Sequence, residues 1–495
     1  MRRILFLFFS LAMVLLILTA CQAELANPPR IATAAANATR LAQPTKESIY
    51  LAVPTTTSAP GAPAVANAPE PHSLHIWINE TSDEHRQALN TMVADFHERS
   101  GIEVELQFID PALLPDLAHT AVLSDTLPDV ILHPLEFTMS WREDGILDAQ
   151  VADAIVNELG TATFDPGALD LVRQDGLVTG VPSDGYQQIL LYRSDWFADE
   201  GLEPPSNYET MLAGAEALFN PDDLRYGLVI PTESNLITTH RAFEHIAIAN
   251  NCQLVDEAGE VLFLSEPCRE ALDFYFSIVN QYSPPGVQTD TSARNAYLDS
   301  RTAMIIAIPG ILPDLVQKNR LNQNTGIITD LSGFLPDNQS ANFGNISYLG
   351  VTPVADEASA AAFINYWFNE GYQTWLAVDA ERKVPMRFGT GDRPRFYIDA
   401  WGTTPILQGE SLTDIFGPEV VAQLRDGIGL TNRWGFRQGQ GALVGHLYDD
   451  MTFSIVLQEM LSGYFNSSKT LYEAYNRVID HIPDYAFPII PTPEA

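Results

Sequence analysis

The feature that most constrains the fold is an alternation of strand-like and helix-like segments that begins near residue 73. Apolar residues alternate with other residues across 74–78 and again across 102–108, as they do in half-buried strands. Between these segments, apolar residues at 89, 92, 93 and 96 fall on one helical face. Two strands joined through a helix indicate a parallel sheet covered by helices. The opening therefore predicts an α/β fold.

Capping residues predict where the first helix begins and ends, and further segments indicate that the strand–helix unit recurs along the chain. Thr81–Glu84 fits a capping box at the start of the first helix, and Gly101 is placed to end it. Further strands are expected at 130–132 and 188–192, and further helices around 114–121, after a capping Ser194 and over 208–218.

The N-terminus carries the pattern of an export signal. Arg2 and Arg3 precede an apolar run over 4–17 that is short for a membrane span. The stretch 18–21 resembles the lipobox of bacterial lipoproteins. This resemblance implies that a signal peptide, residues 1–20, is removed and that Cys21 is acylated. An uncleaved N-terminal anchor helix is the alternative.

The segment after the signal has a different composition from the rest of the chain. Residues 21–72 are rich in Ala, Pro, Thr and Asn, and such a segment buries too little apolar surface to order itself. We expect it to act as a tether between the lipid anchor and the folded body. Residues 489–495 are expected to form a frayed tail.

The cysteine count fits an exported protein. The chain has three cysteines, so acylation of Cys21 leaves Cys252 and Cys268 as an even pair. Disulfides persist outside the cytoplasm, and the turn-like sequence at 256–260 could bring the two sulfurs together in a hairpin. Two unrelated buried thiols are the alternative.

Charge and motif searches exclude several function classes. A net charge of −36 disfavours nucleic acid and anionic membrane surfaces as partners. No nucleophile elbow, zinc-protease, paired-cysteine or phosphate-loop motif is present, and the glycines of 439–445 are more typical of a loop than of a dinucleotide site. His240 and His245 have the wrong spacing for one helical face and are interpreted as ordinary polar residues. We therefore expect no catalysis, no metal and no cofactor.

Five stretches, in their order along the chain, resemble one known family. They are LHIWINETSDEHRQALNTMVADFHERSGIEVEL, LPDVILHP, GLVTGVPSDGYQQILLYRSDWFADEGLEPPSNYETML, SYLGVTPVADEASAAAFINYWFNEGYQTWLA and KVPMR. Together they are similar to the extracellular solute-binding proteins of the maltose-binding type, which serve ABC importers.

The resemblance implies an α/β, two-lobed fold of the periplasmic-binding-protein type, with a hinge and a ligand cleft between the lobes. Lobe I would hold 73–183 and 342–384, and lobe II would hold 184–341 and 385–488. The links GVPSDG and KVPMR are expected to act as the hinge on which the lobes close over ligand.

Ligands of open α/β sheets lie beyond the carboxyl ends of strands, and this rule selects the candidate residues. After the predicted strands and crossings come Asn79, Glu80, His133, Glu136, Phe137, Asp184, Tyr186, Gln187, Pro309, Gly310, Ser347, Tyr348 and Arg387. Trp401 and Trp434 are added as aromatic candidates from the second lobe. Packing inside the core or between the lobes is the alternative for each aromatic residue.

The expected ligand is a small solute, with a carbohydrate favoured because carboxylate, amide and tyrosine side chains suit hydroxyl groups and sugar faces. A polyamine is the main rival, since Glu80, Glu136 and Asp184 could pair with ammonium groups. A phosphate ester, a secreted carbohydrate-active enzyme and a sensor for a membrane kinase are further alternatives. The expected partners are the transmembrane subunits of an ABC permease, and the protein is expected to be a monomer on the outer face of the cell membrane.

Overall fold

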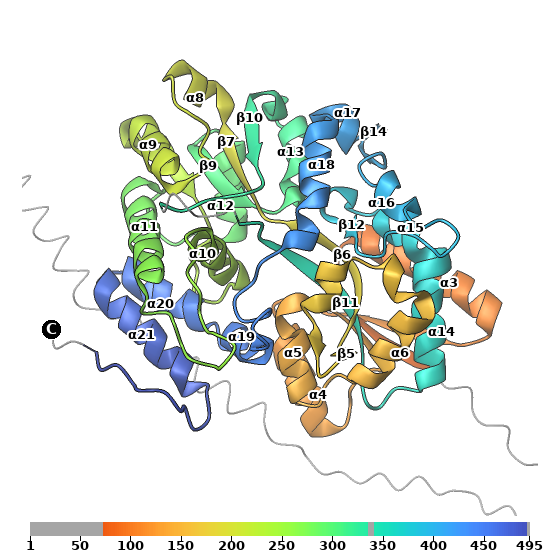
Figure 1. Cartoon of the computed structure of the whole chain (residues 1–495). Helices are drawn as coiled ribbons and strands as arrows, with labels where there is room; N and C mark the ends of the chain where they lie inside the picture. The colour runs from red at the N-terminus through yellow and green to blue at the C-terminus, as the bar shows by residue number, and fades with distance from the viewer. Residues whose placement is uncertain (1–72, 335–340, 493–495) are drawn as a thin grey trace, which may run out of the picture. The chain divides into compact units, whose positions relative to one another are not determined.

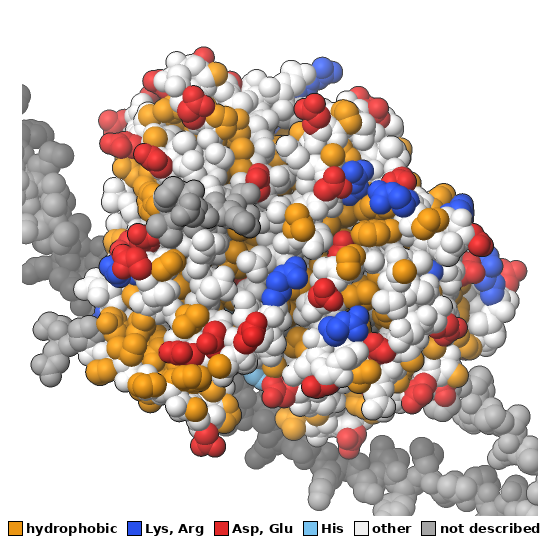
Figure 2. Space-filling view, in the orientation of Figure 1, with side chains coloured by type: hydrophobic (Ala, Val, Ile, Leu, Met, Phe, Trp, Pro, Cys, Tyr) orange, Lys and Arg blue, Asp and Glu red, His pale blue; other side chains and the backbone are white. Residues whose placement is uncertain are grey.

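The computed structural model describes residues 73–334 and 341–492. Cys21, the signal peptide and the tether predicted from the sequence lie outside these residues. None of the helices in the described ranges combines the length and apolar composition that a membrane span requires. Figure 2 shows acidic side chains scattered over one face of the molecule with fewer basic ones, in line with the net charge of −36.

Two sheets organise the described chain (Figure 1). The first has six strands, in the order β12 (Val384–Pro385), β6 (Val181–Gln187), β11 (Gly344–Val351), β3 (Val130–Pro134), β1 (Leu74–Ile78) and β2 (Val104–Phe108). The second has four, in the order β10 (Thr325–Ile328), β7 (Ile189–Arg193), β9 (Thr302–Ala307) and β8 (Tyr226–Val229). The chain passes from the first sheet to the second at Gln188, between β6 and β7.

The predicted α/β character is confirmed, but the first sheet is mixed rather than parallel. β1 pairs in parallel with β2 and β3, whereas β11 is antiparallel to both β3 and β6. The reason is that β11 enters this sheet on the chain's return from the second sheet, so no crossover helix fixes its direction. The limits predicted for the two lobes stay a prediction.

Helices cover both sheets. Those that follow strands of the first sheet are α3 (Asp83–Ser100), α4 (Leu114–Ser124), α5 (Leu135–Glu143), α6 (Ala149–Leu159), α14 (Glu357–Tyr366) and α15 (Tyr372–Leu376). Those around the second are α8 (Ser194–Asp199), α9 (Tyr208–Leu218), α10 (Ile237–Ala249), α11 (Glu266–Tyr282), α12 (Asp290–Leu298) and α13 (Leu312–Gln317).

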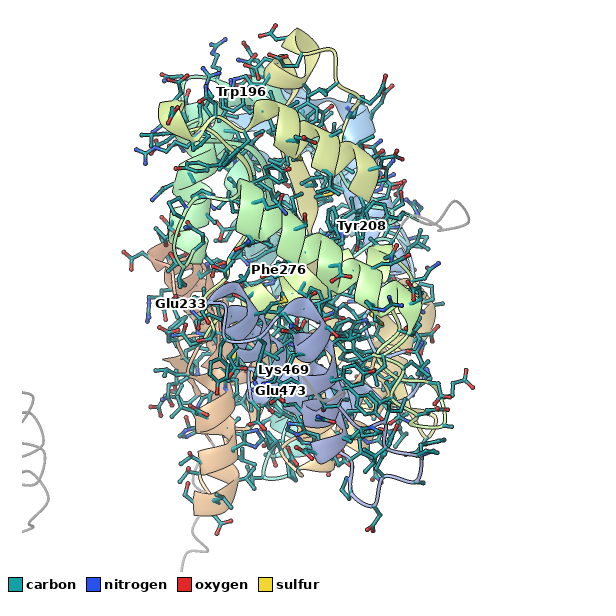
Figure 3. The ribbon with its side chains drawn as sticks, turned by 90° about the vertical axis from the view of Figure 1, so that its left-hand side faces the viewer. Trp196, Tyr208, Glu233, Phe276, Lys469 and Glu473 are labelled. Carbon is teal, nitrogen blue, oxygen red and sulfur yellow. A yellow bond between two sulfur atoms is a disulfide. The ribbon has the colours of Figure 1, made fainter. Side chains whose placement is uncertain are left out.

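The C-terminal part of the chain adds α16 (Phe396–Ala400), α17 (Leu412–Phe416), α18 (Pro418–Asp426), α19 (Gly441–Asp449), α20 (Thr452–Leu461) and α21 (Ser467–Asp480). Figure 3 shows α21, which carries Lys469 and Glu473, beside α11, which carries Phe276, and the two helices are in contact. The C-terminal helices therefore extend the packing around the second sheet.

Some of the helix-capping residues predicted from the sequence are confirmed by the structure and others are not. Gly101 ends α3 with a left-handed φ of 73°, and Asn207 caps α9 with a capping box. The first cap is Ser82 rather than Thr81, because the Ser82 hydroxyl accepts the His85 N–H at 3.3 Å. α8 begins at Ser194 itself with no side-chain cap, so the predicted capping role of Ser194 is wrong.

The predicted loop over the glycines of 439–445 is wrong, because this segment begins α19, which packs on α5. A Cβ on Gly445 would lie 2.3 Å from Ser140 Oγ and 2.9 Å from the Glu136 carbonyl oxygen. The glycine is therefore needed for close helix approach rather than for loop flexibility.

We expect Gly445→Ala to lower the free energy of unfolding by about 1–3 kcal/mol, the usual cost of overpacking. The better helix propensity of alanine opposes this by only about 1 kcal/mol. Gly391→Ala is the matched control, because a Cβ there would meet nothing within 4 Å. Urea unfolding of both variants is the measurement, and equal stabilities would contradict the packing role of Gly445.

Candidate functional site

A cavity of about 300 Å³ lies between the two sheets. From the side of the first sheet it is lined by Asn79, Glu80, Pro134, Phe137, Tyr186, Asn345, Ser347 and Arg382. From the side of the second sheet come Asn235, Leu236, Ile237, Thr238, Arg241 and Asp290. Asn79 and Glu80 directly follow β1, where ligands of open α/β sheets are expected. A larger cavity of about 450 Å³, between the ends of α11 and α20, has no lining residue from the first sheet.

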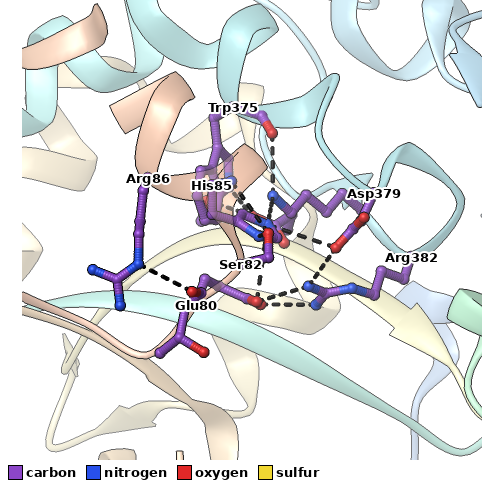
Figure 4. A network of polar contacts seen from close by, with 11 residues as sticks. Glu80, Ser82, His85, Arg86, Trp375, Asp379 and Arg382 are labelled. Atoms are coloured by element: carbon purple, nitrogen blue, oxygen red, sulfur yellow. Dashed lines mark hydrogen bonds and ion pairs between the residues drawn. The ribbon is translucent and has the colours of Figure 1, made fainter. Parts of the chain in front are cut away.

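An ion pair forms one wall of the cavity. Arg382 Nη1 and Nη2 donate to the two Glu80 carboxylate oxygens, each at 2.7 Å, and Arg382 Nη2 also donates to Asp379 at 3.0 Å (Figure 4). Burial raises the pKa of Glu80, but the charge and hydrogen bonds of Arg382 outweigh it and lower the pKa to about 2. Glu80 is therefore an ionised acceptor in a fixed orientation.

A buried lysine lies behind this ion pair. Lys383 Nζ is 2.9 Å from His85 Nε2 and 3.3 Å from the centre of the Trp375 ring. Burial lowers the pKa of Lys383 to about 8 and that of His85 to about 4. Neither side chain lines the cavity, so both support Glu80 from behind.

A second ionic group forms the floor and joins the two sheets. Arg241 Nε, on α10, donates to Glu136 Oε1, on α5, at 2.7 Å. The same oxygen lies 3.1 Å from Arg433 Nη2, and Arg433 Nε donates to Glu244 Oε1 at 3.0 Å. Glu136, Arg433 and Glu244 are fully buried. The floor thus consists of alternating charges that hold Arg241 against the cavity.

The opposite wall presents a carboxylate that no cation pairs with directly. Asp290, at the first position of α12, opens onto the cavity. The surrounding protein raises the pKa of Asp290 through burial, against the lowering effects of Thr238 and Arg241. Asn79 Oδ1, across the cavity, has no hydrogen-bond partner among the described residues. These groups leave hydrogen-bonding capacity for a hydroxyl-rich ligand.

One aromatic residue lies partly open at the cavity. Tyr186, on β6, is half-buried, and its hydroxyl accepts from Arg241 Nη1 at 3.4 Å. Phe137, on α5, also lines the cavity but is almost fully buried. Tyr186 is thus the better placed of the two to stack on a ligand.

The structure brings some of the predicted site residues together and not others. Those that line the cavity are Asn79, Glu80, Phe137, Tyr186 and Ser347. Pro309 and Gly310 do not line it. Glu136 lies beneath the cavity, inside the ionic floor.

His133 and Tyr348 are packed within the first sheet. The His133 ring lies 5.2 Å from the Trp141 ring and 6.2 Å from the Tyr348 ring, centre to centre. Tyr348 donates its hydroxyl to the Ala168 carbonyl at 2.8 Å. Burial lowers the pKa of His133 to about 4, so the imidazole is neutral at pH 7. Both rings have core partners and do not line the cavity.

Three further predicted polar residues bind other parts of the protein. Asp184 accepts from Ser183 Oγ at 2.7 Å and is buried. Gln187 Nε2 donates to the Gln423 carbonyl at 2.6 Å. Arg387 Nη2 donates to the Leu159 carbonyl at 3.0 Å. Their hydrogen bonds hold β6 and the segment after β12 in place.

Four aromatic side chains singled out in the sequence are buried away from the cavity. Trp401 Nε1 donates to the Ala380 carbonyl and Trp434 Nε1 to the Cys252 carbonyl, each at 2.8 Å. His240 and His245, which were interpreted from the sequence as ordinary polar residues, are buried. His240 stacks on Tyr448 with ring centres 3.7 Å apart, and burial lowers the pKa of His245 to about 3. The reason is that other parts of the protein cover α10 on several sides, so both histidines are buried although they do not lie on one helical face.

Arg241, Asp290 and Arg382 line the cavity and were not selected from the sequence. Asp290 begins α12, Arg241 lies in the second turn of α10, and Arg382 ends a short 3-10 helix, so the three share no position that would mark them as ligand residues. One usable signal was the Thr289 capping box, which places Asp290 at a helix start.

Cys252 follows α10, and Cys268 lies in the first turn of α11. Their Sγ atoms are 2.04 Å apart. The expected turn at 256–260 is present and is closed by an isolated bridge, Val255 with Val261, and by a backbone hydrogen bond from Leu262 N–H to the Leu254 carbonyl at 2.8 Å, but the two segments do not form regular strands. The sulfurs are therefore brought together by a helix start and a loop rather than by two strands.

Comparisons with known proteins agree with this architecture. The family model of bacterial extracellular solute-binding proteins matches residues 91–389. YcjN of Escherichia coli, named as an ABC transporter periplasmic-binding protein, is 24% identical over 321 residues, which are 63% of this chain and 73% of YcjN. The mannitol-binding protein of Pseudomonas aeruginosa is 27% identical over 245 residues, 48% of this chain and 55% of that protein.

A solved structure shares the fold. The ABC transporter solute-binding protein of Thermotoga lettingae, bound to α-D-tagatose, aligns with a TM-score of 0.65 and 19% identity. The alignment covers 83% of this chain and all of that one. The two-lobed fold expected from the sequence is thereby confirmed.

Proposed function

Because this chain belongs to the family of bacterial extracellular solute-binding proteins, we propose that it captures a sugar or sugar alcohol in the cavity between its sheets and delivers it to an ABC-type permease. The observation that supports this most is the lining of the cavity from both sheets, with fixed acceptors, an arginine and one half-buried tyrosine. The same ligand class is favoured by a relative named as a mannitol-binding protein and by a solved structure that contains bound tagatose.

A polyamine is less well supported by the cavity. Two of the carboxylates on which that alternative depended already bind arginine, since Glu80 pairs with Arg382 and Glu136 with Arg241. The third, Asp184, is buried against Ser183 and does not line the cavity. Among the described residues, Asp290 is the one lining carboxylate without an ion pair, so the cavity offers a polyamine one free anionic group rather than several.

Titration calorimetry with D-mannitol, D-tagatose, maltose and spermidine tests the proposal. We expect saturable binding of at least one sugar or sugar alcohol and none of spermidine. Tyr186→Ala should weaken that binding by about 1–3 kcal/mol, or roughly 5- to 150-fold, if the ring stacks on the ligand. Tyr464→Ala is the control, because Tyr464 is 73% exposed and does not line the cavity. Equal affinities for both variants would remove Tyr186 from the site.

We also propose that the protein is an exported lipoprotein with a Cys252–Cys268 disulfide. The lipobox-like stretch ending at Cys21, the even pair that remains, and the 4.5 Å between the Cα atoms of Cys252 and Cys268 support this. Mass spectrometry of the native, unreduced protein should find a lipid on an N-terminal Cys21 and one linked peptide that contains Cys252 and Cys268. An intact Met1 would contradict the lipidation of Cys21. Two peptides with free thiols at Cys252 and Cys268 would contradict the disulfide.

A further inference from the structure

A second cavity adjoins the first. It has a volume of about 390 Å³ and shares Thr238 and Asp290 with the candidate site. It lies at the carboxyl end of β9, beside α10 and α12. Its walls are mainly aliphatic, and we call it the aliphatic chamber after Ala242, Ala293, Ile305, Ile306, Ala307 and Ile311.

Two polar residues at the edge of the aliphatic chamber, Arg294 and Gln188, are engaged within the protein, whereas Thr238, Asp290 and Thr291 lie where the chamber meets the first cavity or along its wall. Arg294 Nε donates to Asp314 Oδ2 at 2.7 Å, and Arg294 Nη2 donates to the Gly310 carbonyl at 2.9 Å. Gln188 Nε2 lies 3.3 Å from His245 Nδ1. The chamber therefore offers few groups that could bind the hydroxyls of a second sugar ring.

The chemistry of the two cavities differs. The first presents the Glu80 carboxylate, Asp290, Arg241 and Tyr186, which suit hydroxyl groups. Beside the aliphatic walls of the chamber, away from Thr238, Asp290 and Thr291, a hydroxyl group would lose its water without gaining a partner, whereas an alkyl group would gain from leaving water. No aromatic ring is among the described residues that line the chamber, so it offers no surface for stacking a sugar face.

We infer that the ligand is amphipathic: a sugar or sugar alcohol that carries an aliphatic substituent of several carbons. This inference rests on the proposed function. The hydroxyl-bearing part occupies the first cavity, and the substituent extends past Thr238 and Asp290, which line both cavities, into the aliphatic chamber.

Calorimetric titration of the full chain with methyl, butyl and hexyl β-D-glucoside tests the inference. Each methylene that is buried improves affinity roughly fourfold, so we expect at least a tenfold gain from methyl to hexyl. A flat or falling series, or the absence of binding by all three, overturns the inference. Unsubstituted D-mannitol and D-tagatose report on the proposed function separately: if either binds while the glucoside series is flat, the inference fails and the proposed function stands.

A variant that fills the chamber gives a second measurement. Ala307 is half-buried at the end of β9 and lines only the second of the two cavities. Ala307→Phe should remove the gain in affinity from methyl to hexyl glucoside, so that the two compounds bind with equal affinity. Ala361→Phe is the matched control, because Ala361 is also half-buried but lies on α14, away from both cavities. A gain that persists in Ala307→Phe would overturn the inference.

Discussion

Arg433→Met is expected to destabilise the protein by about 3–5 kcal/mol, because it removes the cation that pairs with the buried Glu244 and leaves the buried Glu136 with Arg241 alone. Arg433 lies between Glu136 on α5 and Glu244 on α10, at 3.1 and 3.0 Å, and all three side chains are 0% exposed. Arg433 Nη2 also donates to the Tyr448 hydroxyl at 3.0 Å. Without the guanidinium, two carboxylates remain close together in a region from which water is excluded.

Arg425→Met is the matched control. Arg425 pairs with Asp426 at 2.7 Å, but their side chains are 26% and 66% exposed. A pair this accessible contributes at most about 1 kcal/mol. Unfolding in urea, followed by circular dichroism, compares the two variants at pH 7. If Arg433→Met costs no more than Arg425→Met, the buried group does not hold α5 and α10 together.

This buried group also shows where the sequence was informative and where it was not. Glu136 was selected because it follows a predicted strand, and that position is correct. Its role could not be inferred, since the two arginines that bind it come from α10 and from the segment before α19. A carboxylate near a strand end looks the same in a sequence whether it meets a ligand or a distant arginine.

Regular elements were easier to predict than contacts. The alternation in β1, the apolar face of α3 and the left-handed Gly101 depend on neighbours in the sequence, and the structure has all three. Gly441 and Gly445 of α19 are different, because the need for glycine there arises from Met139 and Ser140 on another helix. Asp290 is a similar case, because it can be recognised as a ligand candidate only once the two sheets are seen to enclose the cavity that it lines.

Asp290→Asn is expected to weaken sugar or sugar-alcohol binding about 10- to 150-fold, the equivalent of one hydrogen bond to a charged group. Asp290 opens onto both cavities, and no ion pair of the described residues engages its carboxylate directly. An asparagine keeps the shape but loses the charge and one of the two acceptor oxygens. Asp222→Asn is the control, because Asp222 is exposed far from the cavity lining.

The raised pKa of Asp290 separates a binding role from a structural one. Burial raises the pKa, so the ionised carboxylate destabilises the folded protein; this cost is complete above the folded pKa and disappears as the pH falls from the folded pKa to the unfolded pKa. Asp290→Asn should therefore leave the ligand-free protein as stable as the wild type at pH 7, or more stable, while it weakens binding. A loss of stability in the ligand-free variant would indicate that Asp290 supports α12 instead.

The raised pKa of Asp290 also predicts that ligand binding depends on pH. Affinity for a neutral ligand should be complete above the raised pKa of Asp290 and should fall as the pH is lowered through it, because the protonated carboxyl is a weaker acceptor. Glu80 and Glu136, each with a pKa of about 2, stay ionised between pH 7 and 5, and His85, with a pKa of about 4, stays neutral. Titration calorimetry from pH 7 down through the raised pKa of Asp290 should show a decline in affinity in the wild type and in Asp222→Asn but none in Asp290→Asn. A decline of equal size in Asp290→Asn would assign the pH dependence to another group and remove Asp290 as the acceptor.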